Sequence, residues 1–222
     1  MRVSDEGNQP PIPGSELSVE TLTLPVDAPL ECGADDADTI AFVVSREDEH
    51  FGGPAHLVLA GEQLEIPPAG AGTVLRATIG LGCDRHAALG PRARTVVPGE
   101  VDAESATGKR SFEVLYGPHN GSTRATLFVG HVPPGAAPWH FHLYDEIVWI
   151  WRGEGRFRTR DGSEPLAPGS AFRIRPREVH IVENTSATEE LVVVGLFTPA
   201  GSPSAAYLAD EGDVPYVLEA AS

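Results

Sequence analysis

Positive charge is scarce in this sequence, and lysine is almost absent. The 222 residues include 16 Lys and Arg against 32 Asp and Glu, which gives a formal net charge of −16 at pH 7. Nucleic acids and anionic lipid surfaces are bound mainly through Lys and Arg, so this balance argues against nucleic-acid and membrane partners. Lys109 is the only lysine. Covalent catalysis through a lysine amine is therefore not expected, unless Lys109 in its polar segment provides it.

Cysteine and long hydrophobic runs are scarce as well. The two cysteines, Cys32 and Cys83, form no C-x-x-C pair, and the N-terminal residues lack the apolar stretch of a secretory signal. We therefore expect a cytoplasmic protein whose cysteines are reduced and structural. Residues 191–197 form one of the longest apolar runs, which suits a strand and is far too short to span a membrane.

Glycine and proline, in contrast, are abundant, with 24 and 20 residues. They divide the chain into short runs, which favours many strands joined by turns over long helices. The hydrophobic fraction of 41% is typical of a globular protein, and a chain of this length can bury a substantial core.

The most informative segment is 139–146, Trp-His-Phe-His-Leu-Tyr-Asp-Glu, which is followed later in the chain by His180. Alternate residues of a strand share a face, so His140, His142 and Glu146 can all point the same way. Imidazoles combined with a carboxylate form a ligand set for a divalent transition metal, whereas Ca²⁺ and Mg²⁺ prefer oxygen ligands. The sequence therefore predicts a metal site. The alternative is that these histidines are hydrogen-bonded polar residues of the core.

Glycines and prolines at fixed distances extend this pattern into two blocks, formed by Gly135, His140, His142, Glu146 and Gly153, and by Gly169, Pro176, His180 and Asn184. These blocks resemble the two sequence motifs of the cupin superfamily, and the resemblance covers roughly residues 110–200. Two departures concern turns and not ligands. The Gly135–His140 loop is one residue shorter than usual, and Arg177 or Glu178 replaces the glycine expected after Pro176.

The resemblance implies an all-β fold of double-stranded β-helix (jelly-roll) barrels with few short helices. It also implies one divalent transition metal per chain, with His140, His142, Glu146 and His180 as ligands. Four protein ligands would close a tetrahedral zinc site, so Fe, Mn, Ni or Cu is favoured and zinc is the alternative. Members of this superfamily are commonly homodimers, and we expect one here.

Internal similarity indicates two such barrels in tandem. Residues 38–45 match 145–152 in pattern, and 60–68 match 168–176. The first copy has Gly33, Asp35, Thr39 and Gly72 where the second has its ligands, so we expect it to be metal-free and structural. If the similarity is only generic strand patterning, the first part is still β-rich. The predicted organisation is a flexible tail (1–18), a degenerate barrel (19–85), a linker (86–110), a metal-binding barrel (111–200) and a C-terminal tail (201–222).

Strand alternation also predicts a pocket. The candidate substrate-binding residues are Trp139, Val148, Ile150, Phe157, Phe172, Arg173 and Arg175. Only one parity of residues 172–175 can face the cavity. An inward Arg173 or Arg175 would clamp a carboxylate or enolate, whereas an outward one would simply belong to a solvated face. Glu146 and Tyr144 are the candidate catalytic residues, because each could exchange a proton at the metal. Trp149 and Trp151 are expected to face outward against the other barrel or a second subunit.

Our leading hypothesis is a metal-dependent enzyme acting on a small oxygenated metabolite, with dioxygenase chemistry slightly favoured. The second hypothesis is a redox-neutral lyase, isomerase, decarboxylase or cyclase of a biosynthetic pathway. The third is a cupin that binds a small molecule without catalysis. Cupins include both kinds of enzyme with nearly this ligand set, so the resemblance alone does not choose between them.

Overall fold

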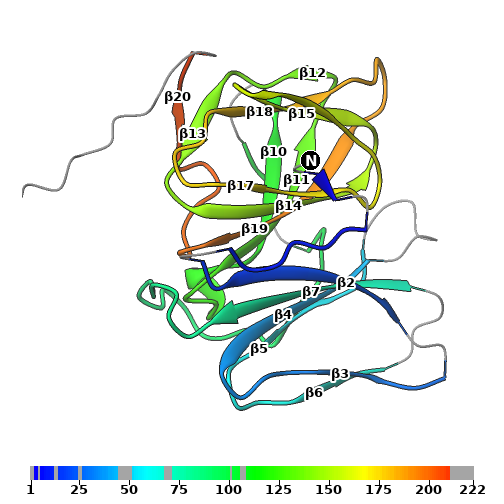
Figure 1. Cartoon of the computed structure of the whole chain (residues 1–222). Coiled ribbons are helices and arrows are strands. Elements are labelled where there is room, and N and C mark those ends of the chain that lie inside the picture. Colours follow the sequence, from blue (N-terminus) through cyan, green and yellow to red (C-terminus); the bar gives the residue numbers. More distant parts are fainter. Residues whose placement is uncertain are drawn as a thin grey trace, which may run out of the picture.

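The computed structural model describes residues 3–4, 6–12, 15–24, 27–44, 52–67, 72–100, 102–105 and 109–210. This part of the chain is almost entirely antiparallel β-structure, as predicted, and includes a short 3₁₀ helix, η2 (Pro118–Asn120). Figure 1 shows two stacked β-structures, the second half of the chain above the first. Within the described residues, no helix has the length and apolar character needed to cross a membrane.

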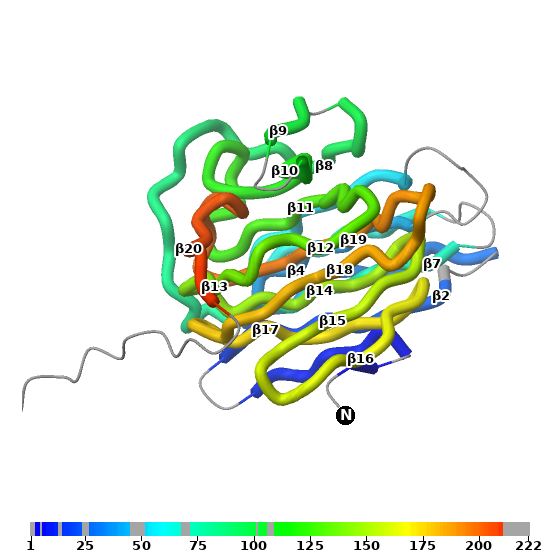
Figure 2. The backbone as a smooth tube through the Cα atoms, turned by 90° about the horizontal axis from the view of Figure 1, so that it is seen from above, coloured from blue at the N-terminus to red at the C-terminus, as the bar shows by residue number. Residues whose placement is uncertain are grey.

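The second half forms a barrel from two facing sheets. One sheet has the order β1 (Val3–Ser4), β17 (Ala171–Ile174), β14 (Asp145–Arg152), β19 (Leu191–Thr198), β11 (Thr126–Val132), β10 (Ser111–Tyr116) and β9 (Glu104–Ser105). The other has the order β16 (Gly162–Leu166), β15 (Gly155–Thr159), β18 (His180–Asn184), β13 (His140–His142) and β20 (Ala206–Leu208), with β12 (Gly135–Ala136) also paired to β18. Figure 2 shows β20 beside β13 at one edge of this barrel.

The first half forms a smaller β-structure of the same kind. Its larger sheet has the order β2 (Leu17–Leu24), β7 (Gly72–Gly80), β4 (Ala37–Val44), β5 (Ala55–Val58) and β8 (Thr95–Val96). Its smaller sheet pairs β3 (Leu30–Cys32) with β6 (Leu64–Ile66), and a small apolar core that includes Cys32, Val43 and Val74 separates the two sheets. The predicted fold class, tandem jelly-roll barrels, is therefore confirmed.

A shared apolar core joins the two barrels. Trp149 is 6% exposed and packs in one cluster with Ile40 and Phe42 of the first barrel. The Trp151 ring meets the Phe42 ring edge-on, with centroids 5.6 Å apart. Of the two partners predicted for these outward tryptophans, the structure places the other barrel against them. The large aromatic area they bury there stabilises the contact between the barrels.

The N-terminal segment is not the flexible tail that the sequence led us to expect. Val3 pairs with Phe172 in the second barrel, and Gln9 forms a backbone bridge with Val19. Its described residues are ordered because they complete the backbone hydrogen bonds of two sheets. The expected linker 86–110 likewise contributes β8 to the first barrel and β9 to the second. Residues 211–222 of the expected C-terminal tail lie outside the described residues, and the boundaries at 85 and 110 stay a prediction.

Candidate metal centre

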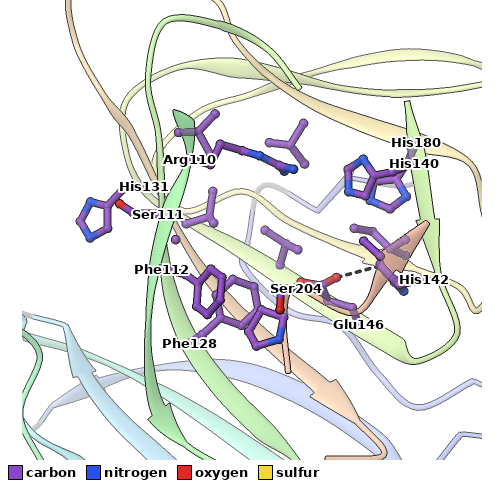
Figure 3. A pocket seen from close by; sticks show the side chains of 18 of the residues that line it. Arg110, Ser111, Phe112, Phe128, His131, His140, His142, Glu146, His180 and Ser204 are labelled. Atoms are coloured by element: carbon purple, nitrogen blue, oxygen red, sulfur yellow. Dashed lines mark ion pairs between the residues drawn. The ribbon is translucent and has the colours of Figure 1, made fainter. Parts of the chain in front are cut away.

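The second barrel encloses a cavity of about 450 Å³ that is lined from both of its sheets. His140 and His142 come from β13, Glu146 from β14 and His180 from β18. The register places His140 directly opposite His180, and their ring centroids lie 4.4 Å apart. The His142 and His180 centroids are 5.1 Å apart. The four residues that the sequence predicted as ligands therefore line one cavity, where Figure 3 shows them together.

Backbone carbonyls fix the orientation of all three imidazoles. The Nδ1 atoms of His140, His142 and His180 lie 2.9, 2.9 and 2.8 Å from the carbonyl oxygens of Pro138, Tyr144 and Glu178. A carbonyl only accepts hydrogen bonds, so each Nδ1 carries the proton. In a neutral ring, Nε2 then presents its lone pair. Metal-binding histidines typically have this arrangement, in which the second nitrogen is held by an outer partner.

Burial keeps two of these rings neutral. Desolvation lowers the pKa of His140 to about 4, and it lowers the pKa of His180 well below its usual value. The neighbouring imidazoles act in the same direction on His180, because two positive charges would repel at this separation. Both rings are therefore neutral near pH 7 and suited to bind a metal.

The contact between His142 and Glu146 tests whether a metal fits. His142 Nε2 lies 2.8 Å from Glu146 Oε2, yet this buried nitrogen has no partner in hydrogen-bond geometry. With Nδ1 already donating, a neutral His142 would place two acceptor atoms in contact. Such a pair needs positive charge, from a proton on the ring or from a cation bound by both atoms. Among the described residues, no three His, Cys, Asp or Glu side chains are already arranged so that they could hold a metal ion. The fit therefore rests on the donor set, which suits a divalent transition metal.

Tyr144 lines the cavity and packs against the candidate metal ligand His142. Its ring stacks on His142 at 4.0 Å and on Phe197 at 3.9 Å. Its hydroxyl donates to the Pro203 carbonyl oxygen at 3.3 Å, and burial raises its pKa. A phenol held in this way is a poor proton donor to a substrate, which argues against the catalytic role predicted for it. It belongs to an aromatic wall with Phe112, Phe128 and Phe197.

The sequence did not indicate Arg110, which lies just before β10 and lines the cavity. Figure 3 shows its side chain reaching across the cavity toward His140 and His180. Burial lowers the pKa of this guanidinium, and the negative charge of Glu146 acts in the opposite direction. Arg110 was missed because it is the last residue of the segment predicted to be a linker. That segment has no periodic pattern from which the orientation of a side chain could be predicted.

Several predicted substrate-binding residues lie elsewhere. Val148 lines the cavity, whereas Phe172 and Ile150 are fully buried in the adjoining core together with Phe157. Phe157 stacks on Phe172 at 4.3 Å, with its ring centroid 6.2 Å from that of His180. They are packed in the core and are not among the lining residues, which argues against direct contact with a substrate.

The other three are also displaced from the cavity. Trp139 is not among the residues that line the cavity, and its ring centroid lies 5.3 Å from the Arg158 guanidinium carbon. On β17, Ile174 occupies the cavity face, so Arg173 points to the opposite side, where it pairs with Asp145. Arg175 shares that parity and is exposed. The carboxylate clamp predicted for Arg173 or Arg175 is therefore wrong for both.

The turn before His180 accommodates the missing motif glycine. Arg177 has φ 66°, in the left-handed region that favours glycine. Its backbone N–H donates to the carbonyl oxygen of His142 at 2.7 Å. The turn thus keeps the geometry that a glycine would provide and ties the loop before β18 to the ligand strand β13.

These features define a class of protein, a β-barrel whose interior presents three oriented imidazoles and one carboxylate in an open cavity. Residues 128–197 match the family described as Cupin domain. The second barrel of this chain therefore matches the cupin domain family, over about a third of the sequence. No curated protein matches its sequence.

Solved structures share the fold at low sequence identity. An oxalate decarboxylase from Bacillus subtilis, whose structure concerns Mn(II) centres, has a TM-score of 0.63 at 13% identity over 94% of this chain and 79% of that one. An IolB-like protein from Salmonella typhimurium has a TM-score of 0.65 at 11% identity, covering 94% and 97%. AerE from Microcystis aeruginosa has a TM-score of 0.62 at 10% identity, covering 82% and 88%. At these identities the likeness establishes the fold alone.

Proposed function

We propose that this chain is an enzyme that holds one divalent transition metal and acts on a small, anionic, oxygenated metabolite. The observation that carries the proposal is the convergence of His140, His142, His180 and Glu146 in a cavity that also contains the Arg110 guanidinium. The metal would supply Lewis acidity or, if redox-active, one-electron chemistry with dioxygen. Arg110 would bind a carboxylate or enolate of the substrate, which is the role that the sequence had assigned to Arg173 or Arg175.

Dioxygenase-type chemistry is the finer proposal, and it rests on the shortage of proton-transfer groups. Within the described lining of the cavity, the titratable side chains outside the ligand set are Arg110, His131 and Tyr144. Arginine stays protonated, and the Tyr144 hydroxyl is held by Pro203. His131 Nδ1 lies 2.8 Å from Glu190, and Figure 3 shows its ring pointing away from the cavity. Chemistry that needs little acid–base assistance from the protein fits this lining best.

A redox-neutral lyase, isomerase, decarboxylase or cyclase is the second candidate. The position of the Glu146 carboxylate favours it. Its carboxylate lies in the cavity in contact with His142 Nε2, where it could accept a proton from the substrate and return it. One of the similar structures is an oxalate decarboxylase. A non-catalytic small-molecule-binding cupin is the third candidate, and it would show ligand-induced stabilisation without product.

Metal analysis of untagged protein by plasma mass spectrometry is the first test. About one equivalent of Fe, Mn, Ni or Cu per chain supports the proposal, and oxygen uptake on a panel of small organic acids then follows. Turnover that continues in a sealed anaerobic assay transfers the assignment to the redox-neutral class, as would one equivalent of zinc. Absence of metal after reconstitution contradicts both enzyme proposals and leaves the binding protein. Light scattering on the same sample tests the predicted homodimer.

A further inference from the structure

The cavity is large and apolar for a metal site that acts on a very small acid. Its volume of about 450 Å³ corresponds to roughly 15 molecules of liquid water. Away from the ligands, its wall is built by apolar side chains of β10, β11, β14, β17, β18 and β19, namely Phe112, Phe128, Val148, Ile174, Val182 and Val193. A ligand of only a few atoms would leave most of this wall facing water.

Two glycines bring the apolar wall up to the ligands. A Cβ at Gly195 would lie 2.2 Å from two atoms of the Phe128 ring and 3.0 Å from Glu146 Oε1. A Cβ at Gly130 would lie 2.9 Å from Val193 Cγ2 and 3.3 Å from the Phe128 ring. The Phe128 ring therefore lies against Gly130 and Gly195, and the contact at Gly195 is beside the Glu146 carboxylate. The aromatic surface thus begins next to the candidate metal centre, where Figure 3 shows Phe112 and Phe128 on one side of the cavity.

The charges in the cavity favour an anion at the same end. Glu146 contributes −1, Arg110 contributes +1 and a bound divalent ion would contribute +2, so these groups together carry +2. Arg110 is substantially buried, so its charge acts in a medium of low dielectric constant. An anionic ligand would offset this net positive charge, whereas a neutral ligand would not.

We propose that the substrate is an amphipathic monocarboxylate, an acid that carries an aryl or alkyl body. Its carboxylate binds Arg110 at the metal end, and its body lies against Phe112, Phe128 and Val182. This inference rests on the proposed function, because it names the substrate class of the same site. It excludes short diacids, which lack the apolar body, and neutral aromatic compounds, which lack the charge.

Calorimetric titration with three probes tests this inference on metal-loaded and metal-free protein. The probes are 3-phenylpropanoate, propanoate, which lacks the ring, and 3-phenylpropan-1-ol, which lacks the charge. We expect 3-phenylpropanoate to bind at least about tenfold more tightly than either. Propanoate binding as tightly would overturn the apolar part, and the alcohol binding as tightly would overturn the carboxylate part.

Variants test which residues bind the phenyl group of 3-phenylpropanoate and which bind its carboxylate. Val182→Phe fills the apolar side, so it should weaken 3-phenylpropanoate by about tenfold and change propanoate by less than about twofold. Val193→Leu is a milder variant with the same expected direction. Arg110→Gln should weaken both acids and leave the alcohol unchanged. Arg175→Gln is the matched control, because that arginine is exposed and outside the cavity. Equal effects of Arg110→Gln and Arg175→Gln would overturn the assignment.

The outcomes separate this inference from the proposed function. Metal content is measured for every variant, together with a thermal melt that verifies folding. Protein that binds metal but does not prefer 3-phenylpropanoate contradicts the substrate class and leaves the metal enzyme intact. Failure to take up metal contradicts the proposed function. In that case, titration of the metal-free protein still tests whether the cavity prefers an amphipathic acid.

Discussion

Arg173 and Asp145 form a buried ion pair on the outer face of β17 and β14, immediately beside the candidate ligand Glu146. Their side chains are 7% and 8% exposed. Strand alternation sends the two neighbouring carboxylates of β14 to opposite faces, Glu146 into the cavity and Asp145 toward the N-terminal segment. There Asp145 also accepts a hydrogen bond from Ser15, and Arg173 donates to the carbonyl oxygens of Pro10 and Leu17. The pair therefore anchors the N-terminal segment to the strand that carries Glu146.

Breaking this pair should be costly for stability. Asp145→Asn leaves the Arg173 guanidinium buried without its counter-ion, and we expect a loss of about 3–5 kcal/mol in the free energy of unfolding. Urea denaturation measures it. Glu20→Gln is the control, since it breaks the exposed ion pair with Arg76, whose side chains are 31% and 43% exposed. The control should change stability by less than about 1 kcal/mol. Equal changes in the two variants would show that Arg173 finds other compensation.

Metal binding should depend on each imidazole. His140→Ala or His180→Ala removes one Nε2 donor from the cavity, and we expect both variants to lose the metal and all turnover. Metal content by plasma mass spectrometry and an activity assay are the two readouts. His131→Ala is the matched control, because its ring points away from the cavity and it should retain the metal. Full activity in a metal-free variant would contradict the proposal.

The stability of the metal-free protein should fall with acid in a defined range. The pKa of His140 is about 4 in the folded protein, against an ordinary value of 6.5. Between these values the unfolded chain takes up a proton that the folded protein excludes, so stability decreases as the pH falls from 6.5 toward 4. Each such histidine contributes at most about 1.4 kcal/mol per pH unit. Denaturation of EDTA-treated protein across this range measures how steeply the free energy of unfolding changes with pH. This slope should be smaller for His140→Gln, and an unchanged slope would show that His140 is not its cause.

Gly195 should tolerate no side chain while Phe128 is present. A Cβ there would meet the Phe128 ring at 2.2 Å, so Gly195→Ala should destabilise the protein by about 1–3 kcal/mol through overpacking. Phe128→Leu shortens the opposing side chain and should recover part of this loss. A double-mutant cycle in urea measures the coupling. Additive losses would mean that the strain at Gly195 has another source.

Much of the fold and of the ligand set could be predicted from the sequence. Alternation along one strand already places His140 and His142 on a common face, and the motif spacing adds Glu146 and His180. The two outward tryptophans needed a partner because water is a poor environment for them, and the first barrel supplies it. Both results depend on local periodicity, which a single sequence displays.

The rest depends on contacts between distant segments. Alternation shows that Arg173 and Arg175 share a face, but only the pairing of β17 with β14 and β1 decides which face meets the cavity. Arg110 and Ser204 enter the cavity from segments without regular pattern. Residues 206–208 lie in the segment expected to be a C-terminal tail and instead form β20, because β13 offers an edge for backbone pairing.

The pairing of β1 with β17 means that the two barrels are interlocked in sequence, since the first strand of the chain completes the second barrel. A cut between residues 86 and 110 would therefore not release two independent halves, because the N-terminal piece would carry away a strand and the Pro10 carbonyl that Arg173 requires. Because the two pieces share this strand pairing and an apolar core, we expect them to reassemble when mixed. A barrel expressed from residue 111 onward would need residues 3–17 attached at another point of the chain, as in a circular permutant.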